Sequence, residues 1–326
     1  MPKTNKGKES KLTASTLEKR CPYGIYFNIE NYNDLIIGNF NTQTTFYSTC
    51  WERYSQTNKT NRIPDLIMEF ISKSPEDHLV QIESFKNAKR KHVNFKAGDY
   101  FSFKINRTEF GFGRLLFDIQ KIRKKGLLPD GHGLNLFLGT PLLVKLFAYK
   151  SAIKNVDISI LDSQPKLPSD VMMDNLLLYG EYEIIGHKEL CEEDFDFPIS
   201  YAQNIDGRKI TFLQWGLMHK ELPLRKFNKY IVGKDEFDRN PFGYHSIGFR
   251  PSYGTIDIVN TISNNGVFDF DACGHYKAKQ DLRNPKNNRA KSEIFKAFKL
   301  DPDKNYIENC KLSNTISITE FLKLPD

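Results

Sequence analysis

The chain has 326 residues, of which 39% are hydrophobic and 27% charged, the usage of a globular protein rather than of a fibrous or low-complexity chain. Residues 1–20 carry six Lys and Arg against two Glu, so most of the formal net charge of +7 belongs to this leading segment. We interpret residues 1–20 as a disordered basic tail and do not expect nucleic acid as a partner. No apolar run approaches the roughly 20 residues that span a bilayer, and no secretory signal is visible, so we predict a cytoplasmic protein without a membrane partner.

Residues 21–92 are predicted to form a mixed region with two helices. Pro64 stands at a first-turn position, and the apolar residues that follow it recur at helical spacing as far as Ile71. A second helix is expected to begin with Ser74 as its N-cap and Pro75 after it. Its buried side chains are predicted to be Leu79, Ile82 and Phe85.

Residues 93–190 are predicted to form a β-rich domain around a hairpin at residues 96–117. Apolar and polar residues alternate from Tyr100 to Ile105, and a second aromatic run begins at Phe110. Gly111 and Gly113 leave one face of that second strand without side chains, which suits a tightly curved sheet or a close approach of other groups. We therefore expect a strongly curled antiparallel sheet or small barrel. Further strands are predicted at 141–149, at 156–160, and at 176–185 with a bulge at the glycine.

Residues 191–326 are predicted to form a second β-rich section that ends in short helices. Its clearest strand covers residues 209–219, which are apolar on both faces and are therefore placed centrally in a sheet. Strands are also expected at 244–249 and 254–262, and helices at 289–300 and 318–324. The predicted fold class is α+β, mostly β with a few helices.

No pattern of residues predicts a catalytic site, a metal or a cofactor. The histidines lack the close spacing that many zinc sites use, and there is no phosphate loop or nucleophile elbow. Among the histidines, His132 lies between two glycines and is expected to be the most exposed. The cysteines show no Cys-x-x-Cys pair and are read as reduced thiols, mostly buried. The histidines of the chain are His78, His92, His132, His187, His219, His245 and His275, and its cysteines are Cys21, Cys50, Cys191, Cys273 and Cys310.

Two charged stretches are candidates for binding a partner. The strongest acidic cluster consists of Glu192, Glu193, Asp194 and Asp196, which forms either a solvated loop or a docking patch for a basic partner. The basic stretch at 277–291 is interpreted as a solvated entry to a helix, because a platform for nucleic-acid bases needs more interleaved aromatic residues than it has.

The hairpin residues Gly98 to Phe103 and Phe110 to Phe117 resemble the opening signature of immunity protein family 26, found beside toxin genes in bacterial polymorphic-toxin systems. The resemblance continues through 141–149 to 181–186. It implies a non-enzymatic protein that binds a cognate toxin and neutralises it by stoichiometric occlusion, with the acidic cluster as the predicted contact. Two alternatives remain open. Some family members carry a phosphotriesterase name, which implies a metal-dependent hydrolase, and the basic stretches leave a nucleic-acid-binding protein as the other.

Overall fold

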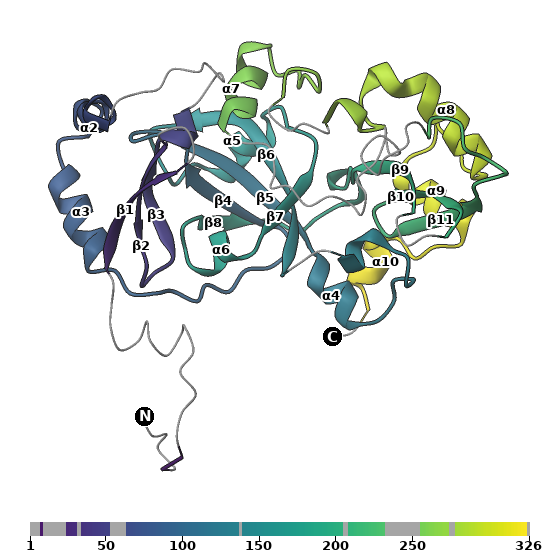
Figure 1. Ribbon diagram of the computed structural model, residues 1–326, viewed down its shortest axis with the longest axis horizontal. Helices are drawn as coiled ribbons and strands as arrows, with labels where there is room; N and C mark the ends of the chain where they lie inside the picture. Colours follow the sequence, from purple (N-terminus) through teal and green to yellow (C-terminus); the bar gives the residue numbers. More distant parts are fainter. Residues whose placement is uncertain are drawn as a thin grey trace.

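The computed structural model arranges the chain as three antiparallel β-sheets that follow one another along its long axis, with helices around them (Figure 1). The predicted α+β class is confirmed. Among the described residues no sheet closes on itself or curls strongly, so the predicted barrel is wrong. No helix in this part of the chain is long and apolar enough to cross a membrane. The structure describes residues 7–8, 24–30, 34–52, 63–136, 139–204, 208–231, 255–273 and 278–324.

The N-terminal sheet has the strand order β1-β2-β3 and is covered by two helices, as predicted for this region. Its core consists of Leu35, Ile37, Phe46 and Tyr47, against which Phe70, Ile82 and Phe85 of the helices pack. The elements are β1 (Ile25–Glu30), β2 (Asp34–Asn39), β3 (Thr44–Ser48), η1 (Thr49–Glu52), α2 (Ile63–Ser72) and α3 (His78–Lys86).

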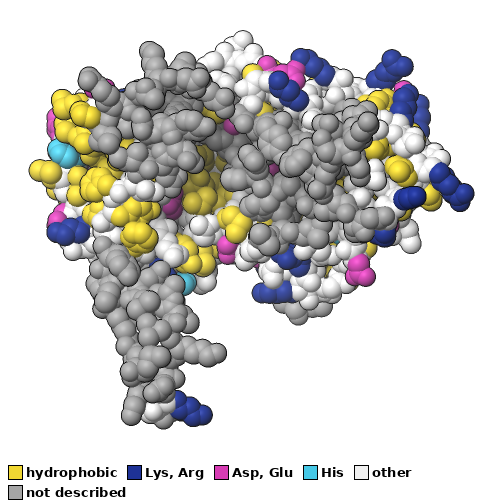
Figure 2. Space-filling view, in the orientation of Figure 1, with side chains coloured by type: hydrophobic (Ala, Val, Ile, Leu, Met, Phe, Trp, Pro, Cys, Tyr) yellow, Lys and Arg dark blue, Asp and Glu magenta, His cyan; other side chains and the backbone are white. Residues whose placement is uncertain are grey.

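Helix α3 differs from its prediction at its start and on one face. It is preceded by Asp77, not by Ser74, whose hydroxyl donates instead to the carbonyl of Phe70 in the preceding helix. Leu79 was expected in the core but is 69% exposed. Figure 2 shows hydrophobic side chains gathered on the side of the molecule where α2 and α3 lie.

The central sheet has the order β7-β6-β5-β4-β8 and contains the predicted hairpin as β4 and β5. The two glycines of β5 admit aromatic rings instead of producing a curl. Gly113 pairs with Phe101 and Gly111 with Phe103, and a Cβ atom at Gly113 would lie 2.4 Å from Cζ of Phe101. The predicted strand at 141–149 is confirmed within β6. The strands are β4 (Asp99–Lys104), β5 (Phe110–Asp118), β6 (Pro141–Ser151), β7 (Asp170–Met173) and β8 (Glu183–His187).

Of two further strands predicted in this region, one is largely helical and the other is helical only in its first part. Residues 156–160 lead into α5 (Ile158–Asp162), because the side chain of Asp157 accepts a hydrogen bond from the backbone N–H of Ser159 and caps the helix. Residues 176–185 contain the helical turn α6 (Asn175–Leu178) before β8 begins. Gly180 lies between them with a φ of +75°, a left-handed conformation that separates helix from strand.

The third sheet has the order β11-β10-β9. The central place predicted for the strand at 209–219 is confirmed, but β10 ends at Trp215, and Gly216, with a φ of +58°, turns the chain into β11. The predicted strand at 254–262 is the helix α7 (Thr255–Ser263), which buries Thr255, Ile258 and Thr261 at three-residue spacing. The strand predicted at 244–249 lies outside the described residues. The strands are β9 (Ile199–Gln203), β10 (Ile210–Trp215) and β11 (Met218–Pro223).

Helices of the C-terminal part pack on this sheet (Figure 1). The helices predicted at 289–300 and 318–324 are confirmed as α8 and α10. The largest apolar cluster runs from Leu116 to Phe321 and so crosses the predicted boundary at 190/191. The remaining elements are α4 (Ile119–Lys124), η2 (Gly133–Leu136), η3 (Glu192–Asp194), η4 (Ala278–Gln280), η5 (Pro285–Asn287), α8 (Asn288–Ala297), α9 (Tyr306–Ser313) and α10 (Ile318–Leu322).

Candidate functional site

The acidic cluster found in the sequence lies in residues 191–196, between β8 and β9, and we call this segment the acidic loop. Its four carboxylates divide into two pairs. Glu192 and Glu193 are exposed, whereas Asp194 is buried and Asp196 bonds to groups inside the protein. Of the four predicted contact residues, Glu192 and Glu193 thus lie on the surface, Asp196 is partly exposed with a 37% exposed side chain, and Asp194 is buried.

Asp194 forms a buried ion pair with Arg114 of β5. Nη1 of Arg114 lies 2.9 Å from Oδ1 of Asp194, and the two side chains are 5% and 10% exposed. The other carboxylate oxygen accepts from the backbone N–H of Cys191 at 2.9 Å. Nη2 of Arg114 donates to the carbonyls of Lys188 and Glu189 at 2.8 and 3.0 Å. The pair therefore fastens the acidic loop and the residues just before it to the central sheet.

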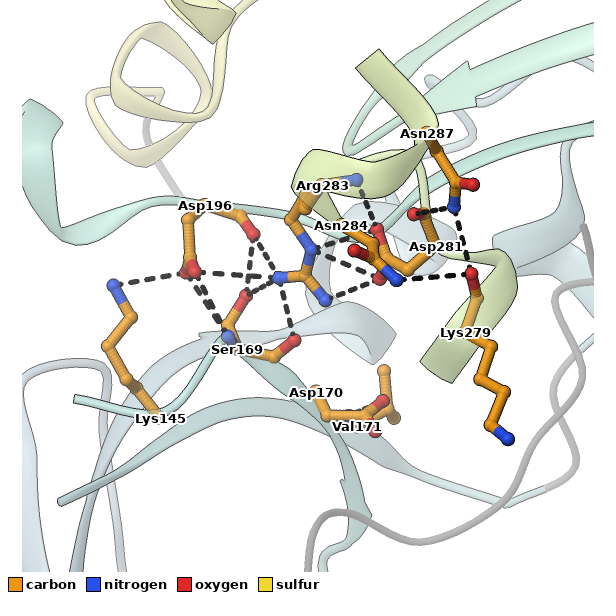
Figure 3. Close-up of polar contacts among 10 residues, drawn as sticks. All are labelled: Lys145, Ser169, Asp170, Val171, Asp196, Lys279, Asp281, Arg283, Asn284 and Asn287. Atoms are coloured by element: carbon orange, nitrogen blue, oxygen red, sulfur yellow. Dashed lines mark hydrogen bonds and ion pairs between the residues drawn. The ribbon is translucent and has the colours of Figure 1, made fainter. Parts of the chain in front are cut away.

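Asp196 joins the acidic loop to two other parts of the chain (Figure 3). Its carboxylate lies 3.0 Å from Nζ of Lys145 in β6 and 3.4 Å from Nη1 of Arg283, and accepts from the backbone N–H of Ser169 at 3.1 Å. Arg283 also pairs with Asp281, with Nη2 and Oδ2 2.8 Å apart. This cluster connects the central sheet with the segment before α8.

Asp170 is a titratable residue of this region that the sequence did not single out. It is the first residue of β7 and lies near the cluster around Asp196 and Arg283 (Figure 3). Its Oδ1 accepts a hydrogen bond from the backbone N–H of Val171 at 2.7 Å. Burial raises its pKa to about 7, and the nearby Arg283 opposes the rise only in part. The sequence around Asp170 gives no signal for this, because the charged groups that act on it come from distant segments.

His132 is buried, so its predicted exposure is wrong. Its Nδ1 accepts from the backbone N–H of Leu134 at 3.1 Å, and its Nε2 donates to the carbonyl of Leu217 at 3.2 Å. Burial and, to a smaller extent, the neighbouring His219, whose ring centroid lies 5.3 Å from that of His132, lower the pKa of His132 to about 3. This neutral imidazole is a structural link between the glycine-rich turn and β11.

The remaining histidines and cysteines provide no metal centre in the described part of the chain. No group of three or more His, Cys, Asp or Glu residues there could hold an ion, while His245, His275 and Cys21 lie outside it. His187 lies between two carboxylates, with Nδ1 2.7 Å from Asp99 and Nε2 3.0 Å from Glu189. Cys310 is buried as predicted, whereas Cys191 is exposed.

The basic stretch at 277–291 uses several of its cations within the protein. Arg283 belongs to the Asp196 cluster, Lys286 bonds to Asp271, and Nε of Arg289 lies 3.5 Å from the carboxylate of Glu293. Ion pairs within the protein thus partly neutralise the charges of these three residues. This arrangement agrees with a solvated, structural segment.

Comparison with known proteins gives one match. Residues 96–209 match the model of the family described as Immunity protein 26, which confirms the resemblance seen in the hairpin. The matching segment contains all five strands of the central sheet, the acidic loop and β9. No curated protein and no solved structure matches the chain.

Proposed function

We propose that this chain is an immunity protein of a bacterial polymorphic-toxin system, which binds a cognate toxin in the cytoplasm and neutralises it by stoichiometric occlusion. The observation that carries the proposal is the match of residues 96–209 to the Immunity protein 26 family. The described residues present no cluster of metal-binding side chains, which gives no support to a metal-dependent hydrolase. An occluding complex of ordinary size would bury about 1,600 Å² of surface.

The contact surface that we propose is the acidic loop. Glu192 and Glu193 present carboxylates to solvent, and the side chain of Glu189 next to them is 90% exposed. Asp194 and Asp196 act by positioning, since their bonds to Arg114, Lys145 and Arg283 hold the backbone of the loop in place. Exposed carboxylates raise the association rate with a basic partner more than they raise the affinity.

The test begins with a tagged pull-down from the native cells, with identification of any protein that co-elutes in stoichiometric amount. The proposal expects a single partner that is toxic when produced alone and whose toxicity disappears when this chain is added. A titration of the toxin's activity should reach its end point at an equimolar ratio. Continued inactivation of excess toxin would indicate a catalytic protein and would contradict occlusion.

The contact surface is tested by reversing charges. The double variant Glu192→Lys/Glu193→Lys should lower the association rate with the toxin by about tenfold or more at low salt, and high salt should reduce the difference. The matched control reverses Glu76 and Asp303, two exposed carboxylates on other elements. If both double variants lower the association rate equally, the effect comes from net charge alone, and the acidic loop is not the contact surface.

A further inference from the structure

A cavity of about 710 Å³ lies between the N-terminal sheet and the edge of the central sheet formed by β4 and β8. The two sheets stand beside each other there (Figure 1), and the backbone N–H of Thr45 in β3 donates to the Glu181 carboxylate across the junction at 2.8 Å. Its lining includes Phe46, Phe85, Ser102, Lys104, Arg107 and Tyr182. The volume falls within the range of small-molecule sites.

Two cations converge on one aromatic ring of this cavity. Nζ of Lys104 lies 4.8 Å from the centroid of the Phe46 ring, and Cζ of Arg107 lies 4.7 Å from the same centroid. Arg107 is only 4% exposed and Lys104 is half-buried. The charge of Arg107 disfavours the charged form of Lys104 in this partly dehydrated place, and a negative group bound beside Lys104 would stabilise it.

The carboxylates that line the cavity do little to neutralise Lys104. Glu183 forms an ion pair with Lys154, at 2.8 Å. Glu181 accepts the bond from Thr45, and burial raises its pKa to about 7, so that it is only partly charged near neutrality. Within the described part of the chain, the ammonium group of Lys104 makes no hydrogen bond or ion pair. Lys104 therefore presents to the cavity a positive charge that no carboxylate of the described residues pairs with.

Ser102 supplies a second, independent indication of a ligand. It stands two residues before Lys104 on β4, so both side chains leave the same face of the sheet and line the same cavity. Ser102 is 2% exposed, and its hydroxyl has no hydrogen-bond partner among the described residues. Buried hydroxyls are nearly always bonded in proteins, so a group that completes this one is expected in the cavity.

We propose that this cavity binds a small organic anion, whose phosphate or carboxylate group is held by Lys104 and by the hydroxyl of Ser102, with Arg107 adding positive charge. The aromatic side chains of Phe85 and Tyr182 offer apolar walls for the rest of the ligand. The space is larger than an inorganic ion requires, which favours a molecule of about nucleotide size. The proposal is independent of toxin binding.

Lys104 gives the site a pH dependence. Burial and, to a smaller extent, the charge of Arg107 lower the pKa of Lys104 to about 8. An anion bound beside the amine raises this pKa, so binding at about pH 8 is accompanied by proton uptake, and affinity falls as the pH rises through about 8. The charged groups that act on Lys104 are Arg107, Lys154, Glu183 and Asp77.

The experiment is isothermal titration calorimetry of the full chain with three probes: inorganic phosphate, adenosine monophosphate and benzoate. We expect adenosine monophosphate or benzoate to bind at millimolar concentration or below. Preference for the nucleotide would identify a phosphate ligand, and preference for benzoate a carboxylate ligand. Absence of binding by all three probes at millimolar concentration would overturn the proposal.

Variants identify the residues that hold the anion. Lys104→Met and Ser102→Ala should each weaken binding about ten- to a hundredfold, because a hydrogen bond from or near a charged group is lost. The control Lys286→Met removes an exposed lysine of another region and should bind as the parent does. Titrations at about pH 8 in buffers of different ionisation enthalpy should show proton uptake that disappears in Lys104→Met. Unchanged affinity and unchanged proton uptake in a folded Lys104→Met protein would refute the assignment.

Discussion

Arg114 and Asp194 are 80 positions apart in the chain, yet their side chains meet in a buried ion pair with 2.9 Å between Nη1 and Oδ1. The guanidinium group also lies over the ring of Tyr100, 4.8 Å from its centroid. Asp194 therefore contributes its charge to the interior, and the partly exposed Asp196 is engaged in ion pairs with Lys145 and Arg283. The surface charge of the acidic loop depends on Glu192 and Glu193.

The first prediction concerns this pair. Arg114→Met leaves the Asp194 carboxylate buried without its counter-ion and should lower the free energy of unfolding by about 3–5 kcal/mol, whereas Arg114→Met/Asp194→Leu should recover much of that loss. Urea denaturation of the parent and the variants measures both effects. Lys86→Met, which breaks an exposed pair with Glu83, is the control and should cost less than about 1 kcal/mol. If Arg114→Met lowers the free energy of unfolding no more than this control does, the buried ion pair is not required for stability.

A second prediction follows from the close contact of Gly113 with Phe101. The Cβ atom of Gly113→Ala would lie 2.4 Å from Cζ of Phe101 and 2.9 Å from Cδ2 of Leu146, so one of these core side chains must move. We expect a loss of about 1–3 kcal/mol in the free energy of unfolding. Phe101→Leu makes room, so Gly113→Ala should cost less in that background, as a double-mutant cycle measures. Strict additivity of the two changes would contradict the contact.

A third prediction concerns pH and Glu181. Burial raises the pKa of Glu181 from 4.5 to about 7. Between these pH values, the carboxyl group is therefore protonated to a greater extent in the folded protein than in the unfolded chain. The contribution to stability is therefore complete below about pH 4.5 and is lost as the pH rises through about 7, by about 1–3 kcal/mol. Glu181→Gln removes this slope, which chemical denaturation at a series of pH values would detect. Parallel pH profiles of the parent and the variant would show that the carboxyl group titrates normally.

A fourth prediction separates two histidines by their titration. Because burial holds the pKa of His132 at about 3, its imidazole should stay neutral from about pH 5 to about pH 8. The hydrogen bonds that its ring donates to Glu189 and Asp99 raise the pKa of His187 above 6.5, so the ring should titrate at higher pH than an ordinary histidine. Proton–carbon NMR of the imidazole signals against pH measures both, with His187→Asn for assignment. A change in the chemical shift of His132 near pH 6.5 would contradict a buried ring whose two nitrogens both make hydrogen bonds.

Local patterns predicted the hairpin β4–β5, the strand β6 and the helices α2, α8 and α10, because each is marked by spacing that its own residues show. The same patterns fail at α5 and α7. Their apolar residues alternate over a few positions, which fits a strand as well as a helix, and the choice depends on a cap at Asp157 and on the burial of Ile258 by other segments.

The candidate site was predicted only as far as charge and sequence adjacency allow. Adjacency placed Asp194 and Asp196 on a surface loop, but their partners Arg114 and Arg283 lie 80 and 87 positions away. The glycines beside His132 suggested exposure, yet Gly133 brings its backbone N–H within 2.9 Å of the Gln214 side chain and so permits burial. Ser102 and Lys104 looked like ordinary outward positions of a strand, because the cavity wall opposite them comes from the N-terminal sheet.

The end of the family match divides the third sheet. The match stops at residue 209, between β9 and β10, although five consecutive residue pairs join these two strands. A fragment cut at that point would lose the partner of β9 and present an unprotected edge rich in buried side chains, which invites aggregation. Strand β10 thus belongs to the same sheet as the last strand of the matched segment. A fragment that retains β9, or an exchange of this segment between related proteins, must therefore also carry β10 and β11.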